Sequence, residues 1–315
     1  MNILADTLAA RPNSQCDVVG LGTIVVDLLM VLDAYPTPDT KNSVKDRLVQ
    51  VGGPVPTALA ALSRLGHRCH FSGNWGDDPL GTVIESDLAE QDIGFGDSQR
   101  ISAGQTGLAH VWIDGRNGQR TIAYARGNCL PRPDAIRQLE LLRNCQILHL
   151  DGWPEEAAVT AATIVRDAGG LVSVDAGSQR PGMRELLEMA HIINCPRKFL
   201  REHLGHDDIA AGLDALSTGE TRLVTITDGS HGAHMWCDGE RFHQPAFQVT
   251  AVDTNGAGDA FCGGLLGAVL QRLSPQDMLR FASAVAAIKC TGMGNRRSLP
   301  TLQAVQEFLG RSRPC

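Results

Sequence analysis

The chain has 315 residues, of which 43% are hydrophobic and 20% are charged, and its formal net charge is -7 at pH 7. The sequence has no run of Lys or Arg of the kind that binds nucleic acid. It also has no apolar run that approaches the roughly 18 residues that a membrane helix needs. The nine cysteines are odd in number and form no Cys-x-x-Cys pair, which argues against a disulfide scaffold or a zinc ribbon. We therefore expect a globular protein with reduced thiols, no membrane span and no nucleic-acid partner.

Residues 1–14 lack a basic start and a continuous apolar run, so they are predicted to form a flexible arm rather than a secretory signal, and the protein is predicted to be cytoplasmic. From 15 to 310, apolar strand-like runs alternate with amphipathic helices. Strands are expected at 16–22, 67–76, 145–152, 171–177, 190–195 and 221–229, and helices at 57–66, 80–93, 155–170 and 257–271. This alternation predicts one three-layer α/β/α domain around a doubly wound, mostly parallel sheet.

Two segments, about 28–53 and 106–128, interrupt this rhythm because polar and apolar residues alternate in them around turn signals. We interpret them as antiparallel strands outside the main sheet, which form a small lid over its edge. A decorative edge sheet is the alternative. Exposed strands of this kind favour pairing between two chains, so a homodimer through the lid is a further expectation.

The segment DTNGAGDAFCGG, residues 253–264, places one carboxylate behind a run of small residues at the expected start of a helix. The first-turn amides of a helix have no intrahelical partner and attract anions, and glycines at 256 and 258 leave their backbone open to a phosphate. The helix end would keep Asp259 ionised as a proton acceptor, which suits phosphoryl transfer. The alternative is an acidic residue that only favours the helix start.

With a second glycine pair at 52–53, in VGGPVPTALAALSRLG, the chain resembles the ribokinase-like (PfkB) family of carbohydrate kinases. The resemblance extends over the motifs DAGSQRPGMRELL, TDGSHGA and FASAVAAIKCTGMGNRRSLPT, in the expected order. Its closest likeness is to ketohexokinase-like members, through HQPAFQV and CTGMGNRRSLPT. The resemblance implies transfer of the γ-phosphoryl group of ATP to a hydroxymethyl group of a sugar, for which we expect a ketose, with Mg²⁺ and room for a monovalent cation.

The resemblance also implies roles for residues at the matching positions. Asp259 would be the catalytic base, and the anion hole would be formed by Gly256, Ala257 and Gly258. The sugar-binding residues would be Asp27, as an ionised hydrogen-bond acceptor, Gly53, Thr57 and Lys41. The ATP-binding residues would be Thr227, Gly229, Gly232, Asn255, Ala287 and Cys290.

Three departures from the family pattern leave parts of the site open. Thr57 stands where the family often has a sugar-binding Asn, and Pro54 follows the glycine pair. Arg197 stands where the family has a Glu that organises the metal through water, so the Mg²⁺ site is undefined and the ion is expected to rest on waters and ATP phosphates. The family's Asp-x-Asn-x-Arg reads Asp-Ala-Gly-Ser-Gln at 175–179.

Several residues have competing interpretations. Lys41 either reaches an anionic group on the acceptor or is an ordinary exposed lysine, and Trp153 either stacks on a sugar or caps the sheet. Arg296 either faces ATP phosphates or is an exposed loop residue. The ten histidines lack metal-binding spacing. For the whole chain, the alternatives to a sugar kinase are a nucleoside kinase of the same fold and a catalytically weak nucleotide or sugar sensor, which Arg197 makes credible.

Overall fold

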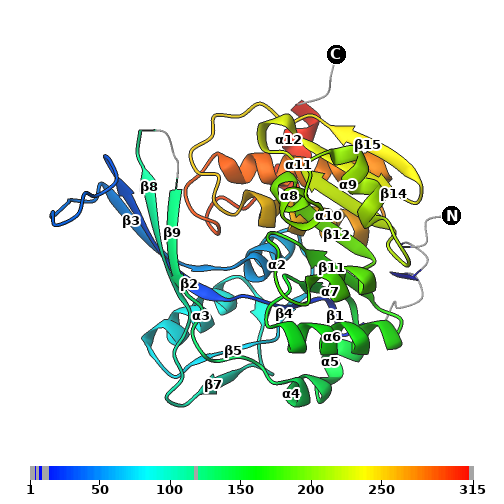
Figure 1. Cartoon of the computed structure of the whole chain (residues 1–315), viewed down its shortest axis with the longest axis horizontal. Helices are drawn as coiled ribbons and strands as arrows, with labels where there is room; N and C mark the ends of the chain where they lie inside the picture. The colour runs from blue at the N-terminus through cyan, green and yellow to red at the C-terminus, as the bar shows by residue number, and fades with distance from the viewer. Residues whose placement is uncertain (1–3, 5–6, 9–13, 117–119, 312–315) are drawn as a thin grey trace.

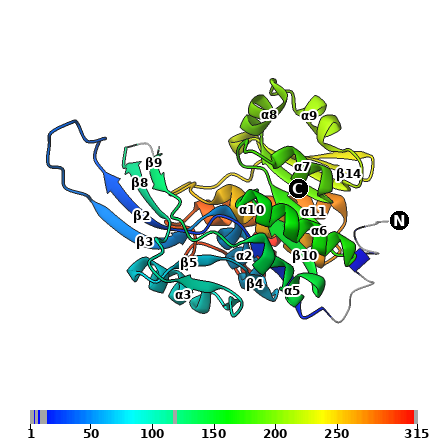
Figure 2. The same cartoon turned by 60° about the horizontal axis from the view of Figure 1, so that its bottom comes forward.

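The computed structural model describes residues 4, 7, 8, 14–116 and 120–311. A large body holds a wide sheet between two layers of helices, and a smaller sheet projects from one side of it (Figure 1, Figure 2). This arrangement confirms the predicted three-layer α/β/α fold with a small additional sheet. Among the described helices, none is long and apolar enough to cross a membrane.

Nine strands form the large sheet, with the order β15-β14-β13-β12-β11-β10-β1-β4-β6. All neighbours from β6 to β13 are parallel, and only the hairpin strands β14 and β15 run antiparallel. The strands are β1 (Cys16–Leu21), β4 (Cys69–Phe71), β6 (Ile93–Gly94), β10 (Cys145–Leu150), β11 (Leu171–Asp175), β12 (Ile192–Pro196), β13 (Leu223–Thr227), β14 (Ala233–Cys237) and β15 (Glu240–Gln244). Ligands of such sheets bind beyond the carboxyl ends of the parallel strands, which places the site.

Helices cover both faces of this sheet, and successive strand residues point into two separate cores. Val18, for example, belongs to one core and Val19 to the other. The first core is closed by α2 (Pro54–Arg64), α3 (Pro79–Glu90), α10 (Ala257–Leu270), α11 (Pro275–Cys290) and α12 (Leu302–Arg311). The second is closed by α4 (Pro133–Arg137), α5 (Glu140–Arg143), α6 (Glu155–Asp167), α7 (Met183–Met189), α8 (Arg197–Leu204) and α9 (Ile209–Leu216). A short 3₁₀ helix, η1 (Gly229–His231), follows β13.

The small sheet has the order β3-β2-β8-β9 and comes from the two predicted lid segments. Its strands are β2 (Val25–Leu32), β3 (Asp46–Gly52), β8 (Leu108–Asp114) and β9 (Arg120–Ala125). The β2/β3 and β8/β9 pairs are antiparallel as predicted, but β2 and β8 pair in parallel. The parallel pairing between the two segments was not predicted, because the alternation within each segment does not specify how the segments pair with each other.

Two other expectations differ in detail from the structure. The strand predicted at 67–76 is two strands, since β4 belongs to the large sheet while β5 (Asn74–Gly76) pairs with β7 (Gln99–Ile101) in a separate ribbon. Most of the predicted arm at 1–14 lies outside the described residues, but the side chains of Leu4 and Leu8 are buried in the first core. The eight described cysteines form no disulfide bond with one another, and Cys315 lies outside the described residues.

Candidate active site

The amino end of α10 is the centre of the candidate site. Gly256 caps the helix with φ of 75°, a left-handed conformation that glycine adopts without strain, and no side chain caps the helix. The N–H of Ala257 donates to Thr254 O at 3.2 Å, so this residue takes part in the turn. The following first-turn amides have no intrahelical acceptor, and together with the helix dipole they suit an anion. Gly258, which is exposed, leaves them accessible.

Asp259 lies in the first turn of this helix and is half-buried. Burial raises its pKa to about 6, against the opposing positive charges of Arg296 and Arg120. The sequence-based prediction that the helix end dominates is therefore incomplete, because desolvation outweighs it. A pKa near 6 still leaves the carboxylate mostly ionised at neutral pH, and it makes the group a stronger base than an ordinary aspartate.

A cavity of about 360 Å³ opens on one side of the α10 amino end. Five of the residues predicted to bind ATP line it, together with two residues of the helix start. These residues are Thr227, Gly229, Gly232, Ala287, Cys290, Ala257 and Gly258. Asn255 does not line the cavity; its N–H donates to the Asp253 carboxylate at 2.8 Å, so it belongs to the turn before the helix.

Ser283 also lines this cavity, and the sequence-based predictions missed it. The side chain is 8% exposed and its hydroxyl has no hydrogen-bond partner in the described part of the chain. A buried hydroxyl without a partner is costly unless a ligand supplies one. Ser283 lies in the helix FASAVAAIKC, two positions before Val285 and four before Ala287. Its place one helical turn before a predicted ATP-binding residue could have identified it from the sequence.

Asp27 lies beside the glycine pair at 52–53 in the small sheet. Asp27 is 7% exposed on β2 and pairs across the lid with Gln50 on β3. Its carboxylate lies so close to Gly52 that an added Cβ there would come within 2.3 Å of it. Burial raises the pKa of Asp27 to about 7, with Arg296 lowering it and Asp259 raising it. At neutral pH Asp27 is therefore only partly ionised, whereas the sequence suggested an ionised group.

Thr57 is fully buried, and its hydroxyl does not face open space. It accepts hydrogen bonds from Asn295 Nδ2 at 3.2 Å and from Arg296 Nη1 at 3.1 Å. An added Cβ on Gly256 would lie 2.9 Å from Asn295 Cβ and 3.5 Å from Thr57 Cγ2, so this cluster adjoins the start of α10. Thr57 thus positions an amide and a guanidinium that come from a loop more than 230 residues away.

Arg296 is 6% exposed, which excludes the interpretation of an exposed loop arginine. Its Nε lies 3.0 Å from the Asp87 carboxylate of α3. Arg296 Nη2, Asn295 Oδ1 and Gln50 Nε2 are buried without partners within the described residues. Because unsatisfied polar atoms are rare in protein interiors, three of them in one cluster mark a place where a polar ligand or water belongs.

Three more buried polar groups lie at the carboxyl ends of strands beneath the α10 start. Asp151, which follows β10, accepts from Thr23 N at 3.1 Å and lies 3.6 Å from Arg180 Nη1. Asp175 accepts from Asn194 Nδ2 at 3.1 Å. Burial raises the pKa of Asp175 to about 8, and the negative charge of Asp259 raises it further. Asp151 directly follows the apolar strand β10, and Asp175 ends the apolar strand β11, so the end of an apolar strand was a usable signal for Asp151.

A family profile covers this whole arrangement: the profile of pfkB family carbohydrate kinases matches residues 16–302. The chain belongs to the pfkB family. As a member it is a phosphotransferase that acts on an alcohol group, and it is a sugar kinase whose substrate these comparisons do not define. The resemblance deduced from the sequence motifs is confirmed, while the finer likeness to ketohexokinases has minor weight.

Curated relatives align over nearly the full length of this pfkB kinase. A fructokinase of Klebsiella pneumoniae is 31% identical over 317 residues, which cover 92% of this chain and 98% of the relative. An ATP-dependent ribose-1-phosphate kinase of Halopiger xanaduensis is 28% identical over 295 residues, with 93% and 97% coverage. The structure of Arabidopsis thaliana ribokinase complexed with ribose and ATP has the same fold, with a TM-score of 0.83, 24% identity and coverage of 93% and 98%.

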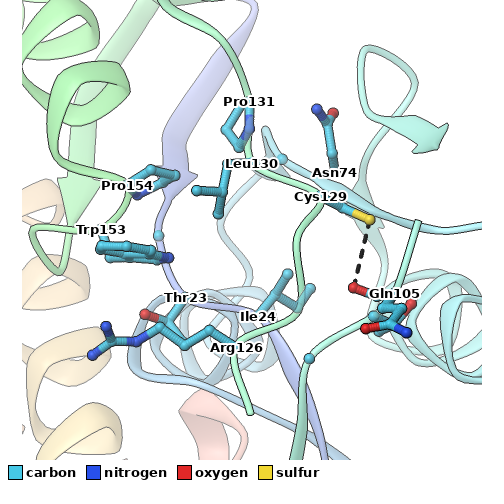
Figure 3. A pocket seen from close by; sticks show the side chains of 14 residues that line it. Thr23, Ile24, Asn74, Gln105, Arg126, Cys129, Leu130, Pro131, Trp153 and Pro154 are labelled. Carbon is cyan, nitrogen blue, oxygen red and sulfur yellow. Dashed lines mark hydrogen bonds between the residues drawn. The ribbon is translucent and has the colours of Figure 1, made fainter.

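Two of the proposed substrate contacts do not join the site of the pfkB kinase. Lys41 is exposed in the segment 33–45 between β2 and β3, which reaches away from the large sheet (Figure 2). Trp153 has its ring covered by the guanidinium of Arg126, whose Cζ lies 4.6 Å from the ring centroid. Trp153 and Arg126 line a small cavity of about 30 Å³ beside Thr23 and Leu130 (Figure 3). The face of Trp153 under Arg126 is thus not open for stacking on a sugar.

Arg197, which replaces the metal-organising Glu of the pfkB family, is held by two acidic residues of neighbouring loops. Its Nη1 lies 3.0 Å from Asp228 Oδ2, and its Nε donates to Asp207 O at 3.0 Å. Asn194 of the same motif keeps a buried place, where Thr225 Oγ1 donates to its Oδ1 at 2.8 Å. No group of three or more His, Cys, Asp or Glu side chains among the described residues forms a metal site.

The raised pKa of Asp175 has a consequence for stability. The unfolded carboxyl titrates near 3.9, whereas the folded one titrates near 8, so between these values the folded state holds the extra proton and stability falls as pH rises. We expect Asp175→Asn, which keeps the acceptor for Asn194, to increase the free energy of unfolding at pH 8 by about 1 kcal/mol or more and to flatten this slope. Urea unfolding from pH 4.5 to 8 measures both. The exposed Asp167→Asn is the control, and an unchanged slope in Asp175→Asn would count against the buried acid.

Proposed function

We propose that this kinase transfers the γ-phosphoryl group of ATP to a hydroxymethyl group of a sugar, with a ketose as the acceptor. One observation carries the proposal: the uncapped amino end of α10 lies between the 360 Å³ cavity and a group of buried polar side chains. We call this group, which consists of Asp27, Gln50, Thr57, Asn295 and Arg296, the acceptor cluster. Asp259 stands at this junction. It is close enough to Asp27 for its negative charge to raise the pKa of Asp27. An anion cradle and a base therefore meet where a donor and an alcohol would meet.

The chemistry follows from these positions. The first-turn amides of α10, with Gly256 setting their direction, would hold the γ-phosphoryl group as it leaves the β-phosphate. Asp259 would accept the proton of the attacking hydroxyl. Because the transition state of phosphoryl transfer is loose, the hydroxyl loses its proton late and a carboxylate is a sufficient base. Positioning and charge stabilisation supply most of the rate enhancement.

The acceptor would bind through groups that partly replace the family's asparagine. Asp27 would accept sugar hydroxyls, and Gly53 would approach the sugar with its backbone. Asn295 Oδ1, Arg296 Nη2 and Gln50 Nε2 would complete the set, since each is buried and unpartnered. A ketose is proposed because fructokinases are prominent among the relatives of this chain. A nucleoside acceptor is the alternative within the fold.

Mg²⁺ fits the site as a companion of the triphosphate rather than as an ion in a protein cage. Mg²⁺ commonly rests on one or two carboxylates plus substrate phosphates and waters. Asp175, with its raised pKa and its hydrogen bond from Asn194, would face the ion, and a nearby dication favours the ionised carboxylate. When bound, the ion neutralises phosphate charge. Arg197 would take no part, because Asp228 and Asp207 hold it.

The lid supports the same reading of the site and a homodimeric state. All six residues of β9 are exposed, and the apolar side chains of Val49, Ile122 and Tyr124 have 53%, 46% and 61% of their surface exposed. Such an edge and face favour pairing with a second lid. We propose that this cytoplasmic enzyme forms a homodimer through its lid, and that the lid closes over the sugar.

A turnover screen tests the proposal. The protein is incubated with ATP, Mg²⁺ and, one at a time, ketoses, aldoses, phosphorylated and sulfonated sugars, and nucleosides. The expected result is ADP formation with a ketose, with ³¹P NMR placing the new phosphate on a hydroxymethyl group. Turnover only with nucleosides would favour the alternative acceptor. ATP binding without turnover on any acceptor would overturn the kinase proposal in favour of a sensor.

Ser283 provides a specific prediction for the donor side. Because its buried hydroxyl lines the cavity without a partner, we expect Ser283→Ala to raise the KM for ATP by about 5- to 10-fold, the value of one neutral hydrogen bond, and to leave kcat within about twofold. Initial rates at saturating sugar measure this split. Ser86→Ala, an exposed serine on α3, is the matched control. An unchanged KM for ATP would remove Ser283 from the nucleotide site.

A further inference from the structure

A lysine side chain lies buried beneath the candidate active site. Lys289, in the last turn of α11, has a relative exposure of 0%. Burying an ammonium group is costly unless other groups pair with it and accept its hydrogen bonds. Lys289 does not line the 360 Å³ cavity, although the cost of its burial calls for a compensating role.

Lys289 is held by one residue, Asp253, through both backbone and side chain. Its Nζ donates to Asp253 O at 2.8 Å and lies 3.6 Å from Asp253 Oδ2. The same carboxylate accepts from Asn255 N at 2.8 Å and from Gly294 N at 2.9 Å. Lys289 and Asp253 thus tie together the turn 251–256 and the loop that follows α11.

These two segments are the ones that bring donor and acceptor together. The turn 251–256 ends at Gly256, which sets the direction of the α10 amino end. The loop after α11 carries Asn295 and Arg296 of the acceptor cluster, and Asn295 Cβ lies against Gly256. A loose connection here would change the distance between the anion hole and the sugar.

The ammonium also contributes to the field at Asp259. Positive charges of Arg296 from the loop after α11, Arg120 from β9 and Lys289 from α11 all lower the pKa of Asp259. Asp151 after β10 raises it, and the charge of Asp259 in turn affects Asp27 on β2 and Asp175 on β11. Lys289 is the one of these cations that has no solvent exposure, so water screens its charge least.

We propose that Lys289 is a positioning residue for phosphoryl transfer. Its ammonium group takes the place of a bound monovalent cation and holds the turn 251–256 against the loop that follows α11. A backbone carbonyl and a carboxylate are the oxygen ligands that an alkali cation would otherwise use, and a lysine supplies the same charge without leaving the site. The inference rests on the proposed function, since it concerns the geometry of that transfer. It replaces the expectation of a separate monovalent cation.

The first test uses the wild-type enzyme. Its kcat in Mg²⁺-ATP is expected to stay within about twofold when Na⁺, K⁺ or the bulky tetramethylammonium ion supplies the same ionic strength. A K⁺ stimulation of about tenfold or more would overturn the proposal, because it would reveal a separate cation requirement. This arm requires no variant, so a folding defect cannot obscure it. A wild type without turnover on any acceptor would instead contradict the proposed function.

The second test removes the charge. Lys289→Met is expected to lower kcat by about 10- to 100-fold and to move the acidic limb of its pH profile upward, because one cation near Asp259 is lost. Ammonium or K⁺ at about 50 mM is expected to restore at least a fifth of the lost kcat, whereas tetramethylammonium is not. The exposed Lys198→Met on α8 is the control. Wild-type kcat in Lys289→Met, or a loss without a shift of the pH profile and without rescue, would show a merely structural lysine.

Discussion

Replacing Asp259 by Asn is expected to lower kcat by about 10²- to 10⁴-fold, the range that general-base catalysis contributes. The amide keeps the size of the side chain and its place in the first turn of α10, but it cannot accept the proton of the attacking hydroxyl. Since Asp259 does not line the cavity proposed for ATP, the affinity for ATP is expected to change by less than about threefold. Steady-state kinetics and titration calorimetry with ATP measure the two quantities.

The matched control is Asp238→Asn, at an exposed turn between β14 and β15. Its kcat is expected to equal that of the wild type. A variant Asp259→Asn with kcat within tenfold of the wild type would exclude Asp259 as the base. Equal losses of kcat and ATP affinity would point to a distorted helix start instead, because removal of a base affects the transition state and not ATP binding.

Replacing Gly53 by Ala is expected to lower kcat/KM for the acceptor by more than about 100-fold. Gly53 has φ of 108°, and an added Cβ would lie 2.1 Å from the backbone oxygen of Thr23, a distance that no Cβ tolerates. Either the end of β3 or the loop at Thr23 must move. Both lie beside the acceptor cluster, and displacement by about 1 Å costs on the order of 10² in rate.

Gly66→Ala separates this steric effect from backbone strain. Gly66 follows α2 with φ of 93°, but nothing lies within 4 Å of its added Cβ. The Gly66→Ala variant is expected to lose about 1 kcal/mol of its free energy of unfolding and to keep the kcat/KM of the wild type. Thermal unfolding and sugar kinetics on both variants test this difference. Equal kcat/KM in Gly53→Ala and wild type would place the acceptor elsewhere.

The sequence predicts the elements of the site because local patterns determine them. Small residues at 256–258 and the apolar stripe that begins at Phe261 indicate where α10 starts, and the alternation in 28–53 and 106–128 indicates the lid strands. The motif order also indicates six residues for ATP, of which the structure brings five into one cavity and leaves out Asn255. Each of these predictions depends on residues that are neighbours in the chain or on a recurring family motif.

The rest depends on contacts between distant segments. Asn295 meets Thr57 across 238 positions and Gln50 across 245 positions, so no local pattern reveals that it completes the acceptor cluster. The parallel pairing of β2 with β8 is equally non-local. Burial likewise determines that the pKa of Asp259 rises rather than falls, and that Lys289 is held inside the protein. These are properties of the packed chain.

The pH dependence of kcat tests most directly whether Asp259 accepts the proton at the α10 amino end. At saturating ATP and sugar, kcat reports groups in the bound complex, so the titration of Asp27 in the free enzyme is suppressed. The wild type is expected to lose kcat along an acidic limb on which Asp259 becomes protonated, and the residual activity of Asp259→Asn is expected to lack this limb. The same acidic limb in both proteins would contradict the assignment of Asp259 as the base.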